Sequence, residues 1–279
     1  MATAKRMASA SSTFETVYRA AIQPIVRRVI PQSARQWVNT QLNRFDYSPP
    51  RGLVQFGQLR RLTPICPHWG FGRGSAVDRY YIERFLGSCA DDIRGRVLEI
   101  AENTYTRRFG GERVTHSDVL HVEPGNPAAT IVADLTLADD IQSDTFDCII
   151  LTQTIQMIYD VRAAIRTLHR ILRPGGVVLA TTHGISKISM PDMSRWGEYW
   201  RFTSRSAARL FEEVFGAGHV SVKSDGNVLT AAAFLYGLAA EDLKPAELDH
   251  QDPAYELLVT IRAVKAPAGV AQKPADAAA

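Results

Sequence analysis

The clearest hydrophobic pattern in the chain lies in residues 146–182. An apolar run at residues 146–151, interrupted by one acid, is typical of a strand buried on both faces. The apolar positions that follow recur at helical spacing and predict a helix over residues 161–172, which a Pro-Gly-Gly turn ends. Residues 177–181 predict a second strand. A strand–helix–strand unit of this length implies a right-handed crossover in a parallel sheet.

Similar patterns predict elements on both sides of this unit. Asp160 and Thr203 stand where side chains can cap the first turns of two helices. Residues 219–223 and 228–237 predict two strands that the Asp225-Gly226 turn joins into an antiparallel hairpin. The remaining predicted elements are strands at 95–101, 113–119 and 130–133 and helices at 78–86 and 204–215.

Composition narrows the class of protein. The chain has 279 residues, 46% of them hydrophobic, which is enough for one large α/β domain with additions. A net charge of +3 with interspersed acids does not require a nucleic-acid partner. Three scattered cysteines predict a reducing compartment, so we expect a cytoplasmic protein with neither a disulfide framework nor a cysteine zinc site. No constellation of metal ligands stands out in the sequence either, so we expect no metal. No apolar run has the length of a membrane span.

The pattern divides the chain into five parts. We expect residues 1–12 to be disordered, 13–92 to form an extension folding over the core, and 93–240 to form the main domain. Residues 241–266 then extend the core, and 267–279 form a disordered tail. Within the extension, residues 14–38 are basic and amphipathic. They fit a helix docked on the domain or a partner, a peripheral membrane contact, or an organellar transit peptide.

Three acids stand at or near the ends of successive predicted strands: Glu99, Asp118 and Asp134. In an open parallel sheet, ligands bind outside the carboxyl ends of the strands. Carboxylates there can accept hydrogen bonds from a ribose, an amine or an adenine amino group. Each acid could instead cap a helix or a turn. Three in succession favour a nucleotide-like ligand.

The order of VLEIA, SDVL, ADLTLADDIQSDTFDCII and LHRILRPGGVVLATT resembles class I S-adenosylmethionine-dependent methyltransferases, over about residues 93–238. The WGEYWRFT and DRYYIE segments resemble members from bacterial glycan-synthesis settings. The resemblance implies a Rossmann-like, mostly parallel seven-stranded sheet with a C-terminal antiparallel hairpin and an N-terminal helical or loop extension. It also implies S-adenosylmethionine as cofactor and a glycan or other small hydroxyl compound as acceptor.

The resemblance assigns roles residue by residue. Glu99 would lie near the methionine amino group, Asp118 would hold the ribose, and Asp134 would read the adenine. The other cofactor residues implied are Ala101, Asn103, Val119, Leu135, Thr152 and Gln153. The family has a glycine-rich turn after the first strand, where this chain has AENTY at residues 101–105. Asn103 could take a left-handed conformation there, and Tyr105 is the larger obstacle.

Methyl transfer to a hydroxyl benefits from a general base. His183 is the candidate, because it follows the fifth strand at the carboxyl edge of the sheet; a loop histidine that caps a backbone group is the alternative. Trp196, Tyr199, Trp200 and Arg201 form an aromatic and cationic cluster that suits either an acceptor or the core. Two other functions stay open: a non-catalytic scaffold and a nicotinamide dehydrogenase, the latter disfavoured because no G-x-G-x-x-G follows a strand.

Overall fold

The computed structural model describes residues 51–54 and 56–267. The chain divides into two units, residues 1–60 and 61–279. The described part of the first unit contains one 3-10 turn, Gly57–Leu59. The predictions for residues 1–12 and 14–38, and for the tail beyond Pro267, fall outside the described residues. Everything below concerns the second unit.

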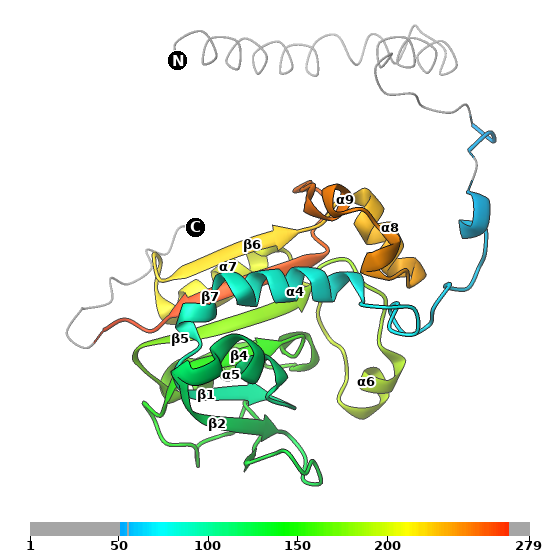
Figure 1. Ribbon diagram of the computed structural model, residues 1–279. Coiled ribbons are helices and arrows are strands. Elements are labelled where there is room, and N and C mark those ends of the chain that lie inside the picture. The colour runs from blue at the N-terminus through cyan, green and yellow to red at the C-terminus, as the bar shows by residue number, and fades with distance from the viewer. Residues whose placement is uncertain (1–50, 55, 268–279) are drawn as a thin grey trace, which may run out of the picture. The chain divides into compact units, whose positions relative to one another are not determined.

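A seven-stranded sheet forms the centre of the second unit (Figure 1), in the order β3-β2-β1-β4-β5-β7-β6. Strands β1 to β5 run parallel to one another, and β7 runs antiparallel to both β5 and β6. The predicted mostly parallel seven-stranded sheet with an antiparallel C-terminal hairpin is therefore confirmed. The strands are β1 Gly95–Ile100, β2 Val114–His121, β3 Ile131–Val132, β4 Phe146–Thr152, β5 Leu172–His183, β6 Val220–Asp225 and β7 Leu258–Val264.

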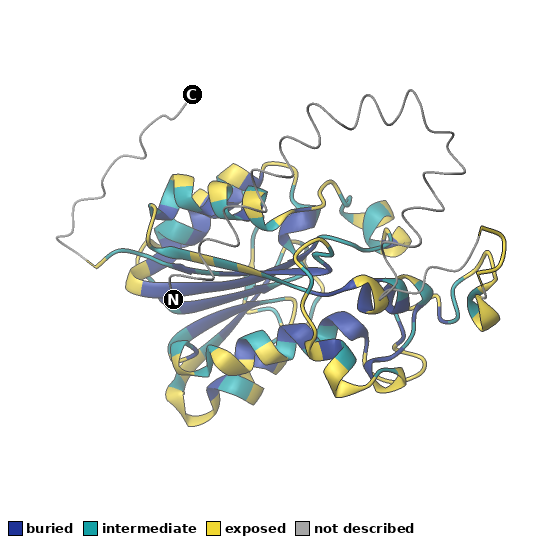
Figure 2. Ribbon diagram, turned by 90° about the horizontal axis from the view of Figure 1, so that it is seen from above, coloured by how far each residue is buried: buried dark blue, intermediate teal, exposed yellow. Residues whose placement is uncertain are grey.

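Helices cover both faces of the sheet, and the strands between them are buried (Figure 2). One apolar cluster joins α5 and α7 to the sheet, and a second cluster joins α4 and α8 to the opposite face. The helices are α4 Val77–Ser88, α5 Val161–Ile171, α6 Met190–Arg195, α7 Ser204–Phe215, α8 Val228–Tyr236 and α9 Pro245–Asp249. Among the described residues, none of the helices combines the length and the apolar character that a bilayer crossing needs.

The crossover predicted from residues 146–182 is present as β4-α5-β5. Asp160 caps α5 by accepting a hydrogen bond of 2.9 Å from the amide of Ala163. Thr203 caps α7 in the same way, and Ser206 completes a reciprocal capping box. These local signals were sufficient because each element satisfies its first turn with a neighbouring side chain.

The predicted hairpin between residues 219–223 and 228–237 is wrong in its second strand. Residues 228–236 form helix α8, whose first turn Asn227 caps by accepting from the amides of Leu229 and Thr230. Gly237 ends the helix in the left-handed conformation, with φ of 69°. Strand β6 pairs instead with β7, so the antiparallel hairpin is built from a segment more than 30 residues further along the chain. Asp225-Gly226 therefore leads from a strand into a helix.

Segments outside residues 93–240 also contribute to this unit. Strand β7, from the predicted C-terminal extension, lies between β5 and β6. Helix α4, from the predicted N-terminal extension, packs against the sheet through Tyr81, Ile82 and Leu86, which are fully buried. The loop that carries α6 connects β5 to α7 and lies near the carboxyl ends of the parallel strands (Figure 1).

Candidate functional site

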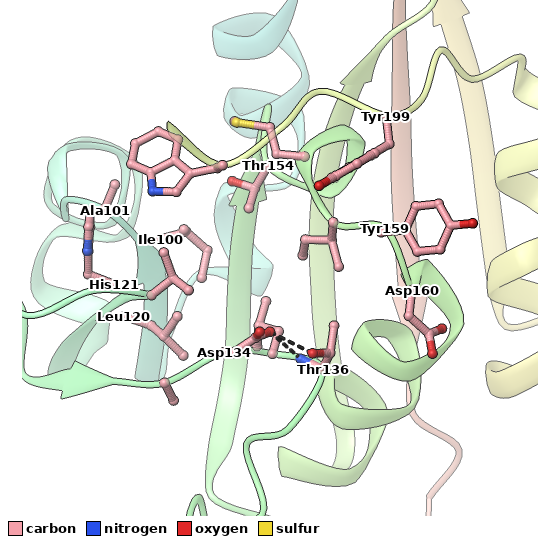
Figure 3. Close-up of a pocket in the computed structure, with 16 residues that line it drawn as sticks. Ile100, Ala101, Leu120, His121, Asp134, Thr136, Thr154, Tyr159, Asp160 and Tyr199 are labelled. Carbon is pink, nitrogen blue, oxygen red and sulfur yellow. Dashed lines mark hydrogen bonds between the residues drawn. The ribbon is translucent and has the colours of Figure 1, made fainter. Parts of the chain in front are cut away.

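A cavity of about 460 Å³ lies at the carboxyl ends of β1 and β2. Ala101 directly follows β1, and His121 is the last residue of β2. Both line the cavity together with Asp134 and Tyr159 (Figure 3), and Trp196 lines it as well. Most of the lining is apolar, with a small number of polar groups among it. This combination is typical of a site for a flat, partly polar ligand.

Asp134 is the one of the three predicted acids that lines this cavity. Its Oδ1 accepts hydrogen bonds from the amide and the hydroxyl of Thr136, at 2.8 and 2.9 Å (Figure 3). These bonds close a turn and fix the side chain. The other carboxylate oxygen has no hydrogen bond within the described part of the chain, so Oδ2 is free to accept one from a ligand. Leu135 lines the same cavity.

Glu99 is buried and serves the loop after β1. Its carboxylate accepts from the amides of Tyr105 and Thr106, at 3.2 and 2.7 Å, and from the Thr106 hydroxyl at 2.7 Å. Burial raises the pKa of Glu99 above its ordinary value, and the hydrogen bonds from Thr106 and Tyr105 oppose that rise in part. Both carboxylate oxygens of Glu99 are therefore used inside the protein, and Glu99 does not line the cavity. Its role is to order the turn after β1, in which Ala101 lines the cavity.

Ala101 takes the left-handed conformation, with φ of 69°, in the turn where the family has glycine. The amide of Ala101 donates to the carbonyl of Leu120, and its own carbonyl accepts from the side chain of Asn126. The expectation that Asn103 supplies the left-handed residue is wrong, since its φ is not positive and its side chain donates to Ser117. The turn keeps the glycine-like backbone at the cost of a strained alanine.

Asp118 does not reach the cavity. Strand β2 continues for three residues past Asp118, which forms an ion pair of 2.7 Å with Arg96 and accepts from the hydroxyl of Thr130. Val119 is likewise buried within β2. The expectation that Glu99, Asp118 and Asp134 share one cavity is therefore wrong for the first two. The side chain at the end of β2 that lines the cavity is His121.

Tyr105 leaves the cavity open. Its ring is nearly buried, stacks on Phe109 with centroids 6.1 Å apart, and belongs to the apolar cluster on the α4 side of the sheet. The turn of residues 101–105 thus leaves the cavity open although it lacks glycine. The sequence did not assign Trp196 to the cofactor region, but its indole ring lines this cavity and packs edge-on against His121, with centroids 6.1 Å apart.

A second cavity, of about 240 Å³, adjoins the first, because Met157 lines both. Gln153 lines the second cavity and has a positive φ of 49°, directly after β4. The side-chain oxygen of Gln153 accepts a hydrogen bond from the side-chain NH₂ of Gln156. The side-chain oxygen of Gln156 in turn accepts one from the hydroxyl of Thr182. Thr152 is paired with β5 in the sheet and lines neither cavity.

His183 ends β5 and lines the second cavity. Its Nε2 lies 3.3 Å from Oδ2 of Asp78 on α4, and both side chains are buried. Burial opposes the ionised form of Asp78, but the hydrogen bond with His183 and the charge of Arg79 outweigh it and hold the pKa of Asp78 below its ordinary value. An ionised acid therefore stands behind the histidine. The pair joins residues more than 100 positions apart.

The sheet thus carries two adjoining cavities at the carboxyl ends of its parallel strands, which is where open α/β sheets bind their ligands. A family model described as a methyltransferase domain matches residues 64–224, which is more than half of the chain. The chain belongs to this methyltransferase-domain family, whose members use S-adenosylmethionine. The first cavity fits that cofactor, since it offers one free carboxylate oxygen of Asp134 within an apolar lining.

Comparisons with solved structures give remote likenesses. Phosphoethanolamine N-methyltransferase 2 from Haemonchus contortus, in complex with phosphomonomethylethanolamine and S-adenosylhomocysteine, is 15% identical with a TM-score of 0.42 and covers 62% of this chain. This chain covers 49% of that enzyme, about half its length. A methyltransferase from Mesorhizobium loti is 14% identical, with a TM-score of 0.44 and coverage of 68% and 98%. The N-methyltransferase NodS from Bradyrhizobium japonicum is 16% identical, with a TM-score of 0.41 and coverage of 68% and 97%. No curated protein matches the sequence.

Proposed function

We propose that this chain is an S-adenosylmethionine-dependent methyltransferase that acts on a hydroxyl group of a glycan or another small acceptor. The observation that carries the proposal is the larger cavity at the carboxyl edge of the sheet, with Asp134 fixed by its own turn and one carboxylate oxygen left over. Family membership supports the reaction class. The glycan acceptor rests on the likeness of the WGEYWRFT and DRYYIE segments to members from glycan-synthesis settings.

Within the cofactor site, Asp134 accepts from the adenine amino group and the backbone of Leu135 contacts the same ring. Glu99 acts indirectly, because it holds the turn in which Ala101 meets the ligand. The cofactor supplies an electrophilic methyl group bound to a sulfonium sulfur. After the transfer, the rest of the cofactor is a neutral thioether. The chain then has to align an acceptor oxygen with that methyl group, and orientation supplies much of the acceleration.

His183 acts as the general base in this proposal. It lines the cavity that adjoins the cofactor cavity at Met157, and an ionised Asp78 lies behind it. This arrangement supports a base more than it supports a loop histidine that caps a backbone group, since no backbone group is bonded to the His183 ring in the described structure. Gln153 and Gln156 complete the wall on the β4 side.

The decisive experiment is a calorimetric titration of the folded full chain with S-adenosylhomocysteine. Binding supports the cofactor site. Failure to bind either this compound or S-adenosylmethionine favours a non-catalytic scaffold, and binding of a nicotinamide dinucleotide instead points to a dehydrogenase.

Asp134→Asn tests the adenine contact. The asparagine oxygen can keep both bonds from Thr136, while its NH₂ replaces the free carboxylate oxygen and opposes the adenine amino group. We expect the binding of S-adenosylhomocysteine to weaken by about 1–3 kcal/mol, while the free energy of unfolding stays unchanged. Asp139→Asn, an exposed acid five residues away that does not line the cavity, is the matched control. Unchanged affinity in Asp134→Asn refutes the adenine role.

Three further parts of the proposal concern partners and location. A small acceptor, with no nucleic acid, agrees with the balanced charge of the chain. A cytoplasmic location agrees with the three free cysteines at positions 66, 89 and 148. A peripheral membrane contact through residues 14–38 is tested by sedimentation of the full chain with anionic vesicles, and equal sedimentation with neutral vesicles argues against it.

A further inference from the structure

The second cavity contains an unusual concentration of unsatisfied polar atoms. Within the described part of the chain, six buried side-chain nitrogen or oxygen atoms lack a hydrogen-bond partner. Four of them belong to residues that line this one cavity: Trp69 Nε1, Asp78 Oδ1, Gln153 Nε2 and His183 Nδ1. Burying such an atom without a partner is unfavourable, so a cluster of four needs an explanation.

Three of the four atoms have a fixed hydrogen-bonding role, whereas the role of the fourth, Nδ1 of His183, depends on the tautomer of the ring. The indole N–H of Trp69 and the NH₂ group of Gln153 are donors. Asp78 Oδ1 is an acceptor, because hydrogen bonding and the charge of Arg79 overcome burial and keep the pKa of this acid low. A ligand that satisfies all of them has to donate and accept at neighbouring positions. Hydroxyl groups do both, whereas an ammonium group cannot accept and a carboxylate cannot donate.

The charges around the cavity point the same way. Three acids, Asp78, Asp192 and Glu198, and one base, Arg79, line it, and Glu198 is already paired with Arg201 at 2.8 Å. An anionic ligand would meet these acids. A cation would leave the two donors of the preceding paragraph unpaired. Trp69 and Phe71 line the cavity on the side that comes from the N-terminal segment, and each ring carries a cation: Lys187 Nζ lies 3.4 Å from the centroid of Trp69, and the guanidinium of Arg79 lies 5.7 Å from that of Phe71.

Asp78 also determines which nitrogen of His183 can take a proton. An ionised carboxylate accepts only, so Nε2 of His183, 3.3 Å from Oδ2, has to carry the hydrogen. In the neutral ring, Nδ1 then carries the lone pair. This is the nitrogen that is buried without a partner in the described structure.

We propose that this second cavity is the acceptor site, that it holds a neutral ring bearing several hydroxyl groups, and that Asp78 orients His183 so that Nδ1 receives the proton of the reacting hydroxyl. The proposal rests on the proposed methyltransferase function. The hydroxyl oxygen bonds to the methyl group, the electron pair of the broken sulfur–carbon bond stays on sulfur, and the proton moves to Nδ1. The resulting imidazolium is balanced by Asp78 and returns its proton to water.

Nitrogen-15 NMR of the histidine rings tests the positioning role without any cofactor or acceptor. The chain has seven histidines, and His183→Gln identifies the signals of the ring in question. We expect the neutral ring to carry its hydrogen on Nε2 in the wild-type chain, and Asp78→Leu to populate the Nδ1–H tautomer. A wild-type ring protonated on Nδ1 overturns the assignment of the base. The wild-type spectrum decides this even if the variant does not fold.

Three matched sugars test the acceptor class: methyl glucopyranoside, glucosamine and glucuronic acid, each titrated up to its solubility limit. The readouts are the His183 ring signals and the indole N–H of Trp69, which Trp69→Phe identifies among the four tryptophans. We expect both sets of signals to shift with the neutral glycoside and not with the charged sugars. No shift with the neutral glycoside, or a stronger effect of either charged sugar, overturns the proposal. Because binding of S-adenosylhomocysteine is measured separately, failure here is distinct from failure of the cofactor site.

Discussion

Replacing Ala101 by glycine tests whether the cofactor turn is strained. Ala101 holds φ of 69°, a conformation that costs an L-residue with a Cβ roughly 1–2 kcal/mol. Glycine removes that cost, but it also gives the unfolded chain more freedom, which lowers stability by about 0.4–1 kcal/mol. The two effects leave Ala101→Gly between about 0 and 1.6 kcal/mol more stable than the wild type.

Ala128→Gly is the matched control. Ala128 is exposed in a nearby loop and does not have a positive φ, so this substitution brings the loss in the unfolded state and no relief of strain. We expect it to lower stability by about 0.4–1 kcal/mol. The difference between the two variants, about 1–2 kcal/mol, then measures the strain directly.

Urea unfolding followed by circular dichroism gives both free energies, and the slope with urea should be the same in all three proteins. Calorimetry with S-adenosylhomocysteine should show that Ala101→Gly binds at least as tightly as the wild type, because the missing methyl group lies on the cavity wall. If Ala101→Gly loses as much stability as Ala128→Gly, the left-handed alanine is not strained and the reasoning fails.

Three other outcomes follow from buried polar groups. Asn227→Ala should cost about 2–4 kcal/mol in urea unfolding, because it removes the cap of α8 and two bonds to backbone carbonyls near α9; Asn227→Ser keeps a capping oxygen and loses only the bonds to the carbonyls, so it should cost less. The stability that Asp78 contributes should be present above pH 3.8 and be lost as the pH falls through its lowered folded pKa, so Asp78→Asn should show a shallower loss in acid. Glu99 has the opposite sign: its raised folded pKa makes stability fall as the pH rises from 4.5 through that pKa, and Glu99→Gln should abolish this slope. Unfolding curves of each variant at a series of pH values check both, and slopes identical to the wild type would contradict them.

Much of the fold follows from the sequence where the signals are local. The β4-α5-β5 unit is a continuous alternation of apolar run, helical spacing and Pro-Gly-Gly turn, with a cap three residues from its partner. The prediction of the hairpin failed because it relied on a local signal alone. Asp225-Gly226 is a strong turn signal, but the partner of β6 is β7, and Asn227 is used to cap a helix rich in alanine. Which strand pairs with β6 depends on contacts distant in sequence.

The residues of the site also divide into those that local patterns reveal and those that depend on contacts distant in the sequence. Asp134 could be found because it directly follows the predicted strand 130–133 and lies two residues after the end of β3, and the turn it closes is made with a residue two positions away. Asp118 was misplaced because β2 runs on to His121, and nothing in the local pattern marks where the strand ends. The role of Glu99 depends on amides six and seven residues later. Asp78 and Trp69 meet His183 only through the packing of α4 and the segment before it, which no spacing in the sequence reveals.

The place of β7 in the sheet has a consequence for how the protein folds. The edge strand β6 pairs only with β7 among residues 51–54 and 56–267, and β5 has β7 on one side and β4 on the other. During synthesis the ribosome therefore releases a sheet with an open, apolar border until residues 258–264 have emerged. Any chain shortened before Leu258 would expose the backbone of β5 to other molecules and be prone to self-association.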